Sequence, residues 1–339
     1  MQSVQMLMRF IVQLVSATNS IELTDTITGV RFSLDCGQVG YFTHYTFSSD
    51  NQTFVSSTKN RVCFWNTATG KLIGEFNTNV HYPCFIWSIM FSPNDQFLVI
   101  ASKEKQIFLV NAKTFSIVGN LTNYPIGRRY VYSYNIVWSH DSTQFAVSCT
   151  DKKVLVFNVG NNSVITIQTV ERFGTITSFA FTPNGNSLAV VFSKVPIIQI
   201  YSLLGSQTLQ MQFEANATNW RTEKPFNSLA FSLTSSLIAA GSMNNRVYYC
   251  SFNPENFEMG EVTIIKARHV KEVSFSPDEL KLIVKKFNGS YHIFILQLAK
   301  TLLLSMMLTG KEGRLRFPQL REHTKRLPNE LWDIIVTFL

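Results

Sequence analysis

Six segments of the chain repeat one pattern of residues, and this repeat limits the possible folds more than any other feature. Each segment has alternating apolar residues that end in an aromatic followed by Ser or Thr, then a turn and two further apolar runs. The anchoring aromatics lie 43 to 50 residues apart, at Phe47, Phe91, Trp138, Phe181, Phe231 and Phe275. A period of this length indicates a solenoid, a propeller or an array of repeats.

Each repeat is predicted to form four short β-strands. Runs of Val, Ile, Phe and Tyr with a period of two residues are separated by the Asn, Asp, Gly and Pro residues of hairpin turns. The second turn uses residues that tolerate positive φ: Lys59-Asn60, Asp151-Lys152, Asn244-Asn245 and Asn288-Gly289. The first turn carries Asp50, Asp95, Asp141 and Asp278, which we interpret as equivalent turn formers and not as catalytic acids.

A seventh, incomplete repeat opens the chain at Phe10 and aligns with the segment that starts at Thr53. In this alignment Thr24–Gly29 matches Trp65–Gly70. The innermost strand of this repeat is missing from the aligned part. Either Met1–Met8 or residues after Met307, such as Gly313–Phe317, are expected to supply it.

A single sheet of this kind cannot bury both of its faces, so neighbouring repeats must stack, and radial stacking leaves only short edges. We therefore expect an all-β fold. Residues 1–308 form a seven-bladed β-propeller of four-stranded blades, 309–326 a basic linker, and 327–339 a short C-terminal α-helical tail.

The repeated Phe-Ser-Pro-Asp-like turn and the Asn-x-x-Thr-Gly motif resemble the WD-repeat family of β-propellers. The Trp-Asp pair of that family appears here as Trp65-Asn66 and in more altered forms elsewhere, and its Gly-His pair is missing. The resemblance therefore implies blades without the family's His–Asp–Ser–Trp hydrogen-bond network, held together by apolar burial.

Composition excludes a disordered chain, because 45% of residues are apolar and only 15% are charged. The five cysteines are scattered without a Cys-x-x-Cys pair, which is typical of a reducing compartment. The N-terminus has no signal-peptide pattern. The apolar stretch Tyr291–Gly310 contains Lys300 and is divided into two strands by the repeat, so no membrane span is expected. The expected location is intracellular and cytoplasmic, with the nucleus as an alternative.

The sequence contains no Gly-x-Ser-x-Gly elbow, phosphate-binding loop, dinucleotide fingerprint or His-Glu-x-x-His motif. We therefore expect no enzymatic activity, no cofactor and no metal. In the WD-repeat family, the loops that enter the innermost strands form the face that binds partners. Other proteins are accordingly the expected partners of this chain.

Two of these loops are long and rich in residues that dominate interfaces. The candidate partner-binding residues are Arg128, Arg129, Tyr130, Tyr132, Trp220 and Arg221. The alternative is that the tyrosines belong to the next strand and that Pro125–Gly127 only turns the chain. One propeller subfamily binds phosphoinositides through Phe-Arg-Arg-Gly, but the order here is Gly127-Arg128-Arg129-Tyr130. Basic and aromatic residues are interleaved in one loop only, so nucleic acid is not expected.

The tail forms a second candidate surface. Pro328 suits the first position of a helix, and Leu331, Ile335 and Phe338 follow at helical spacing. These residues resemble the opening helix of an F-box, which implies binding to the linker subunit of a ubiquitin ligase. The predicted contact residues are Leu327, Pro328, Leu331, Trp332, Ile335 and Phe338. The alternative is that this helix packs on its own propeller.

The sequence therefore predicts a protein-interaction platform, with substrate recognition for a cullin-type ubiquitin ligase as its use. A scaffold subunit of a multiprotein assembly is the main alternative. A propeller that binds phosphoinositides or a membrane surface is a further alternative.

Overall fold

The structure is a computed structural model of the whole chain. It describes residues 10–15, 20–35, 44–58, 61–77, 86–102, 106–120, 135–149, 152–169, 173–205, 209–214, 225–234, 236–253, 255–276 and 279–296. The chain divides into two compact units, residues 1–293 and 294–339, and only residues 294–296 of the second unit are described. The predicted linker, 309–326, and the predicted tail helix, 327–339, lie outside the described residues.

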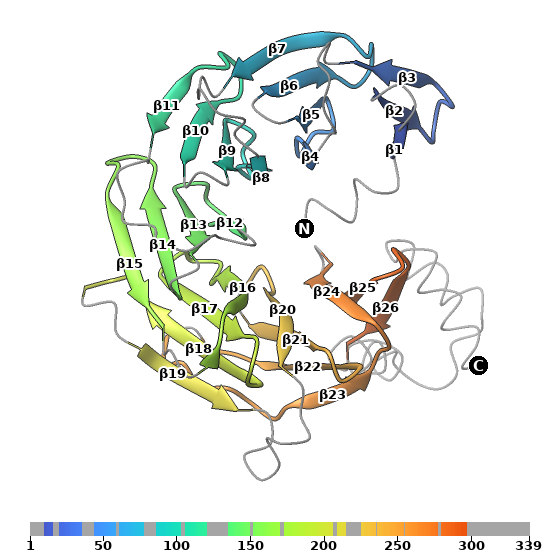
Figure 1. Cartoon of the computed structure of the whole chain (residues 1–339). Helices are drawn as coiled ribbons and strands as arrows, with labels where there is room; N and C mark the ends of the chain where they lie inside the picture. Colours follow the sequence, from blue (N-terminus) through green and yellow to red (C-terminus); the bar gives the residue numbers. More distant parts are fainter. Residues whose placement is uncertain are drawn as a thin grey trace, which may run out of the picture. The chain divides into compact units, whose positions relative to one another are not determined.

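The described part of the chain forms seven sheets, and strands that follow one another in the chain are neighbours in each sheet (Figure 1). The first three sheets are β1 (Phe10–Val15), β2 (Ser20–Asp25) and β3 (Arg31–Leu34); β4 (His44–Phe47), β5 (Thr53–Ser57), β6 (Arg61–Asn66) and β7 (Leu72–Asn77); and β8 (Ile86–Phe91), β9 (Phe97–Ser102), β10 (Ile107–Asn111) and β11 (Ile117–Asn120).

The last four sheets are β12 (Ile136–Trp138), β13 (Gln144–Ser148), β14 (Lys153–Asn158) and β15 (Val164–Gln168); β16 (Ile176–Phe181), β17 (Ser187–Phe192), β18 (Ile197–Ser202) and β19 (Leu209–Glu214); β20 (Phe226–Phe231), β21 (Leu237–Ser242), β22 (Arg246–Ser251) and β23 (Thr263–Lys266); and β24 (Val270–Phe275), β25 (Lys281–Lys286) and β26 (Tyr291–Ile295). The fold is therefore an all-β propeller of seven sheets, most of them four-stranded, as the repeat predicted.

The repeat alignment is confirmed in register as well as in strand order. All six anchoring aromatics are the last residue of an innermost strand. In the incomplete first sheet, Phe10 pairs with Asp25 as Thr53 pairs with Asn66 in the second sheet. β1 is therefore the equivalent of β5, the second strand of a complete sheet. The fourth strand expected for the seventh sheet lies outside the described residues.

The turn after each anchoring aromatic is built around a buried hydroxyl. The Ser92 hydroxyl accepts the Phe97 amide hydrogen at 3.0 Å and donates to Asn94 Oδ1 at 2.7 Å. Asp50 and Asp141 occupy the Asn94 position in their own turns. The interpretation of Asp95 as their equivalent was wrong. Asp95 lies one position later, at φ 56°, because Asn94 already fills the position that accepts the hydroxyl.

The predicted positive-φ turns are confirmed where they are described. Lys152, Asn245 and Gly289 have φ values of 64°, 64° and 83°. Asn and Gly tolerate this left-handed conformation, which allows a tight connection between the second and third strands.

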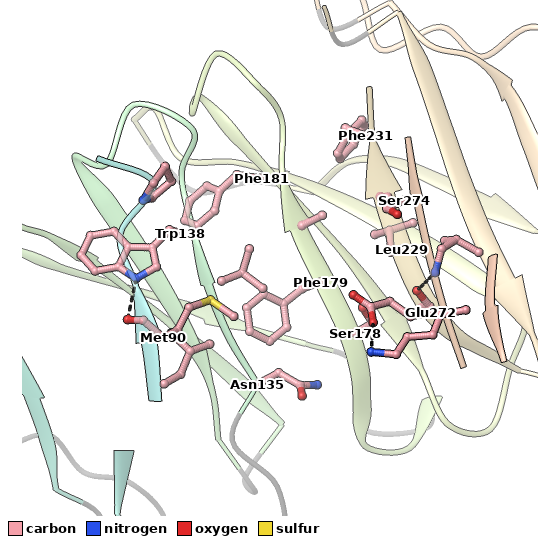
Figure 2. A pocket seen from close by; sticks show the side chains of 18 of the residues that line it. Met90, Asn135, Trp138, Ser178, Phe179, Phe181, Leu229, Phe231, Glu272 and Ser274 are labelled. Carbon is pink, nitrogen blue, oxygen red and sulfur yellow. Dashed lines mark hydrogen bonds and ion pairs between the residues drawn. The ribbon is translucent and has the colours of Figure 1, made fainter. Parts of the chain in front are cut away.

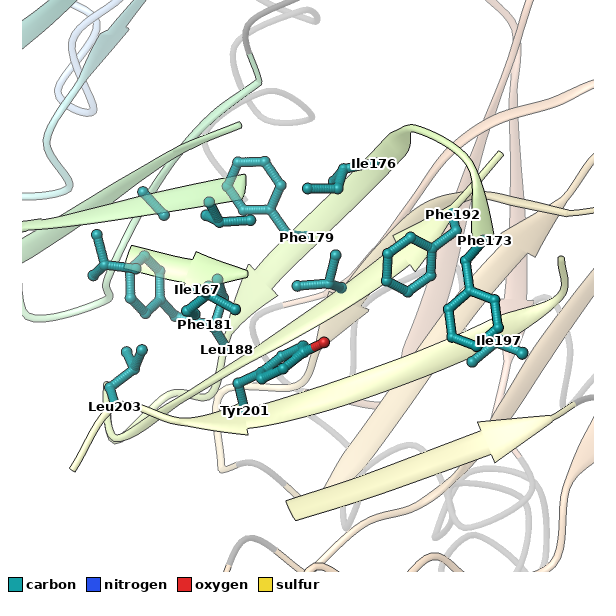
Figure 3. Packing of buried hydrophobic residues seen from close by; sticks show 14 residues of the cluster. Ile167, Phe173, Ile176, Phe179, Phe181, Leu188, Phe192, Ile197, Tyr201 and Leu203 are labelled. Atoms are coloured by element: carbon teal, nitrogen blue, oxygen red, sulfur yellow. The ribbon is translucent and has the colours of Figure 1, made fainter. Parts of the chain in front are cut away.

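Apolar burial between sheets holds the propeller together. Each described apolar cluster joins two consecutive sheets. In the cluster between the fourth and fifth sheets, Phe179, Phe181 and Phe192 pack with Ile167 and Tyr201 (Figure 3). A hydrogen bond of the Trp–Ser type found in the WD-repeat network is present in the second sheet. The buried Trp65 indole donates to the Ser56 hydroxyl at 2.9 Å.

Candidate functional site: the central channel and its rims

A cavity of about 1090 Å³ lies among the seven sheets, and each of them contributes to its lining. In the first sheet the lining strand is β1, and in the next five it is β4, β8, β12, β16 or β20. In the seventh sheet β24 and Lys285 of β25 line the cavity. The side chains in this channel are largely apolar, as Phe179, Leu229 and Met90 illustrate (Figure 2). We refer to the end where the innermost strands begin as the entrance rim, and to the end where they finish as the exit rim.

The charged side chains of the channel lie on one side of it. Among the lining residues, the Lys and Glu side chains are Lys271 and Glu272 of β24 and Lys285 of β25. Lys285 Nζ lies 3.7 Å from Glu272 Oε2 and 6.0 Å from the centroid of the Tyr291 ring. The seventh sheet therefore gives the channel a polar, charged wall.

A series of hydrogen bonds joins neighbouring sheets at the entrance rim. Asn135 Nδ2 donates to the Thr177 carbonyl at 2.9 Å, and the Thr177 hydroxyl donates to the Phe226 carbonyl at 2.7 Å. Asn227 Nδ2 then donates to the Val270 carbonyl at 2.6 Å. These bonds hold the fourth to seventh sheets together at the points where their innermost strands begin.

His44 makes the equivalent bond between the second and third sheets. Its Nδ1 lies 3.2 Å from the Ile86 carbonyl oxygen. Since a carbonyl only accepts, Nδ1 carries the hydrogen. His44 is exposed at its surface, but partial burial of its ring lowers its pKa, and this effect outweighs the bond to Ile86, which raises it.

A second series of bonds joins the sheets at the exit rim. Asp95 accepts from the Ser49 amide at 2.7 and 2.9 Å and from the Ser49 hydroxyl. The Ser142 hydroxyl accepts from the Asn94 amide at 3.1 Å. Glu279 Oε1 accepts from the Thr234 amide at 2.6 Å. Asp95, Ser142 and Glu279 all have φ between 56° and 62°. The left-handed residue of one turn is therefore the acceptor for the turn of the preceding sheet.

Asp141 remains within its own turn. Partial burial raises the pKa of Asp141, but the hydrogen bonds that Ser139 and Thr143 donate to it outweigh this effect and hold the pKa below its usual value. Asp141 is therefore an ionised residue of the turn. The sequence analysis predicted its role as a turn former.

The sixth and seventh sheets form a projecting corner of the entrance rim. The Ala267 amide donates to the Asn245 carbonyl, and the His269 amide donates to Asn245 Oδ1, both at 2.9 Å. The Phe287 amide donates to the His269 carbonyl at 3.0 Å. The segment between β23 and β24 thus connects two hairpin tips, from which Met243 and Phe287 project with 60% and 62% of their surface exposed. Sequence reasoning missed this corner, although residues 266–286 hold six Lys and Arg residues.

The partner-binding residues predicted from the sequence lie outside the described residues. Arg128, Arg129, Tyr130 and Tyr132 belong to the connection between β11 and β12, and Trp220 and Arg221 to the connection between β19 and β20. Both connections lead into an innermost strand, at Asn135 and Pro225 of the entrance rim. The six predicted contact residues of the tail are likewise outside the described part of the chain.

The described residues contain no group of three His, Cys, Asp or Glu side chains placed to hold a metal ion. Within the same residues there is no helix with the length and apolar character that a membrane span requires. Cys63, Cys149 and Cys250 are buried, as expected from their apolar neighbours.

Two solved structures share the fold of this chain. The β-propeller domain of Myceliophteria thermophila Cps50 (Swd1) has a TM-score of 0.56 at 17% identity, and the match covers 84% of this chain and 95% of that one. A chain of the mitotic checkpoint complex has a TM-score of 0.60 at 14% identity, with 82% of both chains covered. These identities establish the fold alone.

The sequence comparisons identify the family. WD repeat-containing protein 1 of Xenopus tropicalis is 35% identical over 82 residues, which are 24% of this chain and 13% of that protein. The chain therefore spans only a small part of the length of that relative. The model of the PROPPIN family matches residues 12–260. The protein is a β-propeller of the WD-repeat type, and it belongs to the PROPPIN family.

Proposed function

We propose that this propeller recognises target proteins on its entrance rim and presents them to a cullin-type ubiquitin ligase. One observation carries the first half of the proposal. The two long connections that contain Arg128-Arg129 and Trp220-Arg221 both lead into innermost strands at this rim, which the Asn135, Thr177 and Asn227 bonds hold in a fixed arrangement. Variable loops on a rigid scaffold are a common basis for recognition.

Protein partners also agree with the multiprotein complex in which a chain of similar fold is found. One of the structures with the same fold is a chain of the mitotic checkpoint complex. In the described residues, the channel presents mainly apolar and neutral side chains, and its charged groups lie on the seventh sheet. A protein-interaction platform is therefore the class of function that the geometry supports best.

The adaptor role rests on the sequence of the tail, in which Leu331, Ile335 and Phe338 share the spacing of an F-box helix. The test is capture of purified ligase linker and cullin subunits on the immobilised full chain. We expect capture to be lost in a chain that ends at Phe317 and in Leu331→Ala/Ile335→Ala. Asp333→Ala, a polar position of the same segment, serves as the matched control and should retain capture.

Equal capture by the full and shortened chains, or no capture by either, would refute the adaptor role. If full and shortened chains then bind the same cellular proteins, the protein is a scaffold subunit.

Membership of the PROPPIN family favours phosphoinositide binding as a second candidate function. The only Arg-Arg pair in the sequence is Arg128-Arg129, and it is not flanked by the Phe and Gly of the Phe-Arg-Arg-Gly motif. Flotation with vesicles that contain phosphoinositides tests this candidate. Binding that is lost in Arg128→Ala/Arg129→Ala and weakened by salt would support it. Equal recovery with phosphatidylcholine vesicles would refute it.

A further inference from the structure

We propose that the projecting corner of the entrance rim is a binding site for an acidic peptide segment that continues from the rim into the channel mouth. We call this surface the basic corner, and it comprises Met243, Lys266, Arg268, Lys271, Lys286 and Phe287. The inference rests on the proposed role as a protein-interaction platform and names the chemistry of one class of partner.

The basic corner is a defined structure because backbone bonds fix its parts. The segment between β23 and β24 is held to the tip of the β21–β22 hairpin by the bonds from Ala267 and His269 to Asn245. It is held to the tip of the β25–β26 hairpin by the bond from Phe287 to His269. A backbone fixed in this way does not need to be ordered when a partner binds.

The charge of the basic corner is unbalanced. Lys266, Arg268 and Lys271 are exposed, and Lys286 is half-exposed. Within the described residues 263–276 and 279–296, the carboxylates are Glu272, which lies beside Lys285, and Glu279, which accepts from the Thr234 amide at the exit rim. The four cations of the corner are exposed or half-exposed, and the printed ion pair of Glu272 is with Lys285 and not with one of them. Such a surface attracts acidic ligands and speeds their association.

The basic corner also contains two exposed apolar side chains, those of Met243 and Phe287. Met243 and Phe287 come from adjacent hairpins and are among the most exposed large apolar residues of the described chain. Aromatic residues, Met and Arg are enriched where proteins bind one another. A peptide with both acidic and apolar side chains matches this combination.

The depth at which the cations lie favours a peptide over a membrane surface. Arg268 and Lys286 are not among the residues that line the cavity, whereas Lys271 of the same corner lines it. An extended chain can follow these groups from the rim into a cavity of about 1090 Å³. A flat membrane can meet only the outer groups and the two apolar tips.

The test is fluorescence anisotropy of a labelled peptide of repeating Asp-Glu-Phe triplets, with Asn-Gln-Phe triplets as the neutral probe. We expect saturable binding of the acidic probe that weakens at high salt. Arg268→Glu/Lys271→Glu should weaken it by about tenfold or more, because like charges then face each other. Met243→Ser/Phe287→Ser should weaken binding but retain its salt dependence.

Lys71→Glu/Lys113→Glu is the matched control. It changes the net charge equally, and both residues are exposed in turns at the exit rim. This variant should bind the acidic probe like the unchanged protein. Circular dichroism and thermal unfolding of all variants establish that each one is folded.

The inference is wrong if the full chain shows no saturable binding of the acidic probe, if it binds both probes equally, or if the charge reversal at the corner has no greater effect than the control. It is also wrong if the chain binds vesicles of equal parts phosphatidylserine and phosphatidylcholine through these residues and does not bind the peptide. Capture of the ligase linker depends on the tail, so its persistence in Arg268→Glu/Lys271→Glu would show that only this inference had failed.

Discussion

The side-chain amide of Asn227 donates a 2.6 Å hydrogen bond to the carbonyl oxygen of Val270, across the boundary between the sixth and seventh sheets. Val270 is the first residue of β24, and the strand bulges directly after it. The bulges of β8, β16 and β20 occur at the same point. A bulge turns a carbonyl out of the ladder. In these four strands the irregularity therefore lies where a backbone carbonyl accepts the bond from the preceding sheet.

Loss of one of these donors should destabilise the propeller. Asn227→Ala leaves the Val270 carbonyl without this bond, and we expect the free energy of unfolding to fall by about 1–3 kcal/mol. Thr177 offers a matched pair, since Thr177→Ser keeps a hydroxyl for the Phe226 carbonyl and Thr177→Val does not. Urea unfolding should rank Thr177→Ser above Thr177→Val. The reverse order would mean that the bond contributes nothing to stability.

His44, which joins the second and third sheets, should make the stability of the propeller depend on pH. Its folded-state pKa lies below the usual 6.5, so the unfolded chain binds protons more readily than the folded one. The stabilising contribution is present above pH 6.5 and is lost as the pH falls through the folded value. His44→Asn keeps a donor for the Ile86 carbonyl, as Asn135 and Asn227 do elsewhere.

The measurement is the difference in melting temperature between His44→Asn and the unchanged protein, from neutral to mildly acidic pH. We expect the variant to gain relative stability as the pH falls. A difference that does not change with pH would show that protonation of His44 is not linked to folding.

The Trp65–Ser56 bond should be measurable because both residues are buried, with 4% and 0% of their surface exposed. Ser56→Ala leaves a buried indole N–H without this acceptor, at a cost of about 1–3 kcal/mol. In a double-mutant cycle with Trp65→Phe, the double variant should lose less stability than the sum of the two single variants, by roughly 0.5–3 kcal/mol. If the stability losses of the two single variants simply add in the double variant, the bond contributes nothing to stability.

Gly74 and Gly119 occupy the same position in β7 and β11, yet they should respond differently to a methyl group. A Cβ on Gly74 would overlap the Phe115 ring of the neighbouring sheet, whereas a Cβ on Gly119 would lie 3.7 Å from Leu109. Gly74→Ala should cost about 1–3 kcal/mol through overpacking. Gly119→Ala should leave the melting temperature unchanged or raise it by reducing the freedom of the unfolded chain. Equal effects would contradict the close packing of Phe115 on Gly74.

The sequence predicted the strands well because each one carries its own local signal. Phe91 followed by Ser92, or Asn245 in a hairpin, is visible without knowledge of any other sheet. The bonds between sheets could not be predicted, since His44, Asn135, Thr177 and Asn227 differ in chemistry and their acceptors are backbone carbonyls 42 to 49 residues away. Asp95 was misplaced because Asp suits both the capping position and the left-handed position of a turn.

The basic corner escaped the sequence analysis for a related reason. Lys266, Arg268 and Lys271 are spaced too widely to form a charge run, and Lys286 joins them only through the register of β24 with β25, in which Val270 pairs with Lys286. Exposure of Phe287 at a hairpin tip was equally invisible, because aromatic residues usually indicate core.

A carbonyl oxygen belongs to the main chain, so no substitution at its own residue removes it. At the entrance rim only the donor can change, and His, Asn and Thr each fulfil the role at a different boundary. At these four boundaries the donor can therefore be exchanged without a compensating change at the residue that accepts its bond. A propeller built in this way can lose its signature residues one repeat at a time over evolution while its architecture persists.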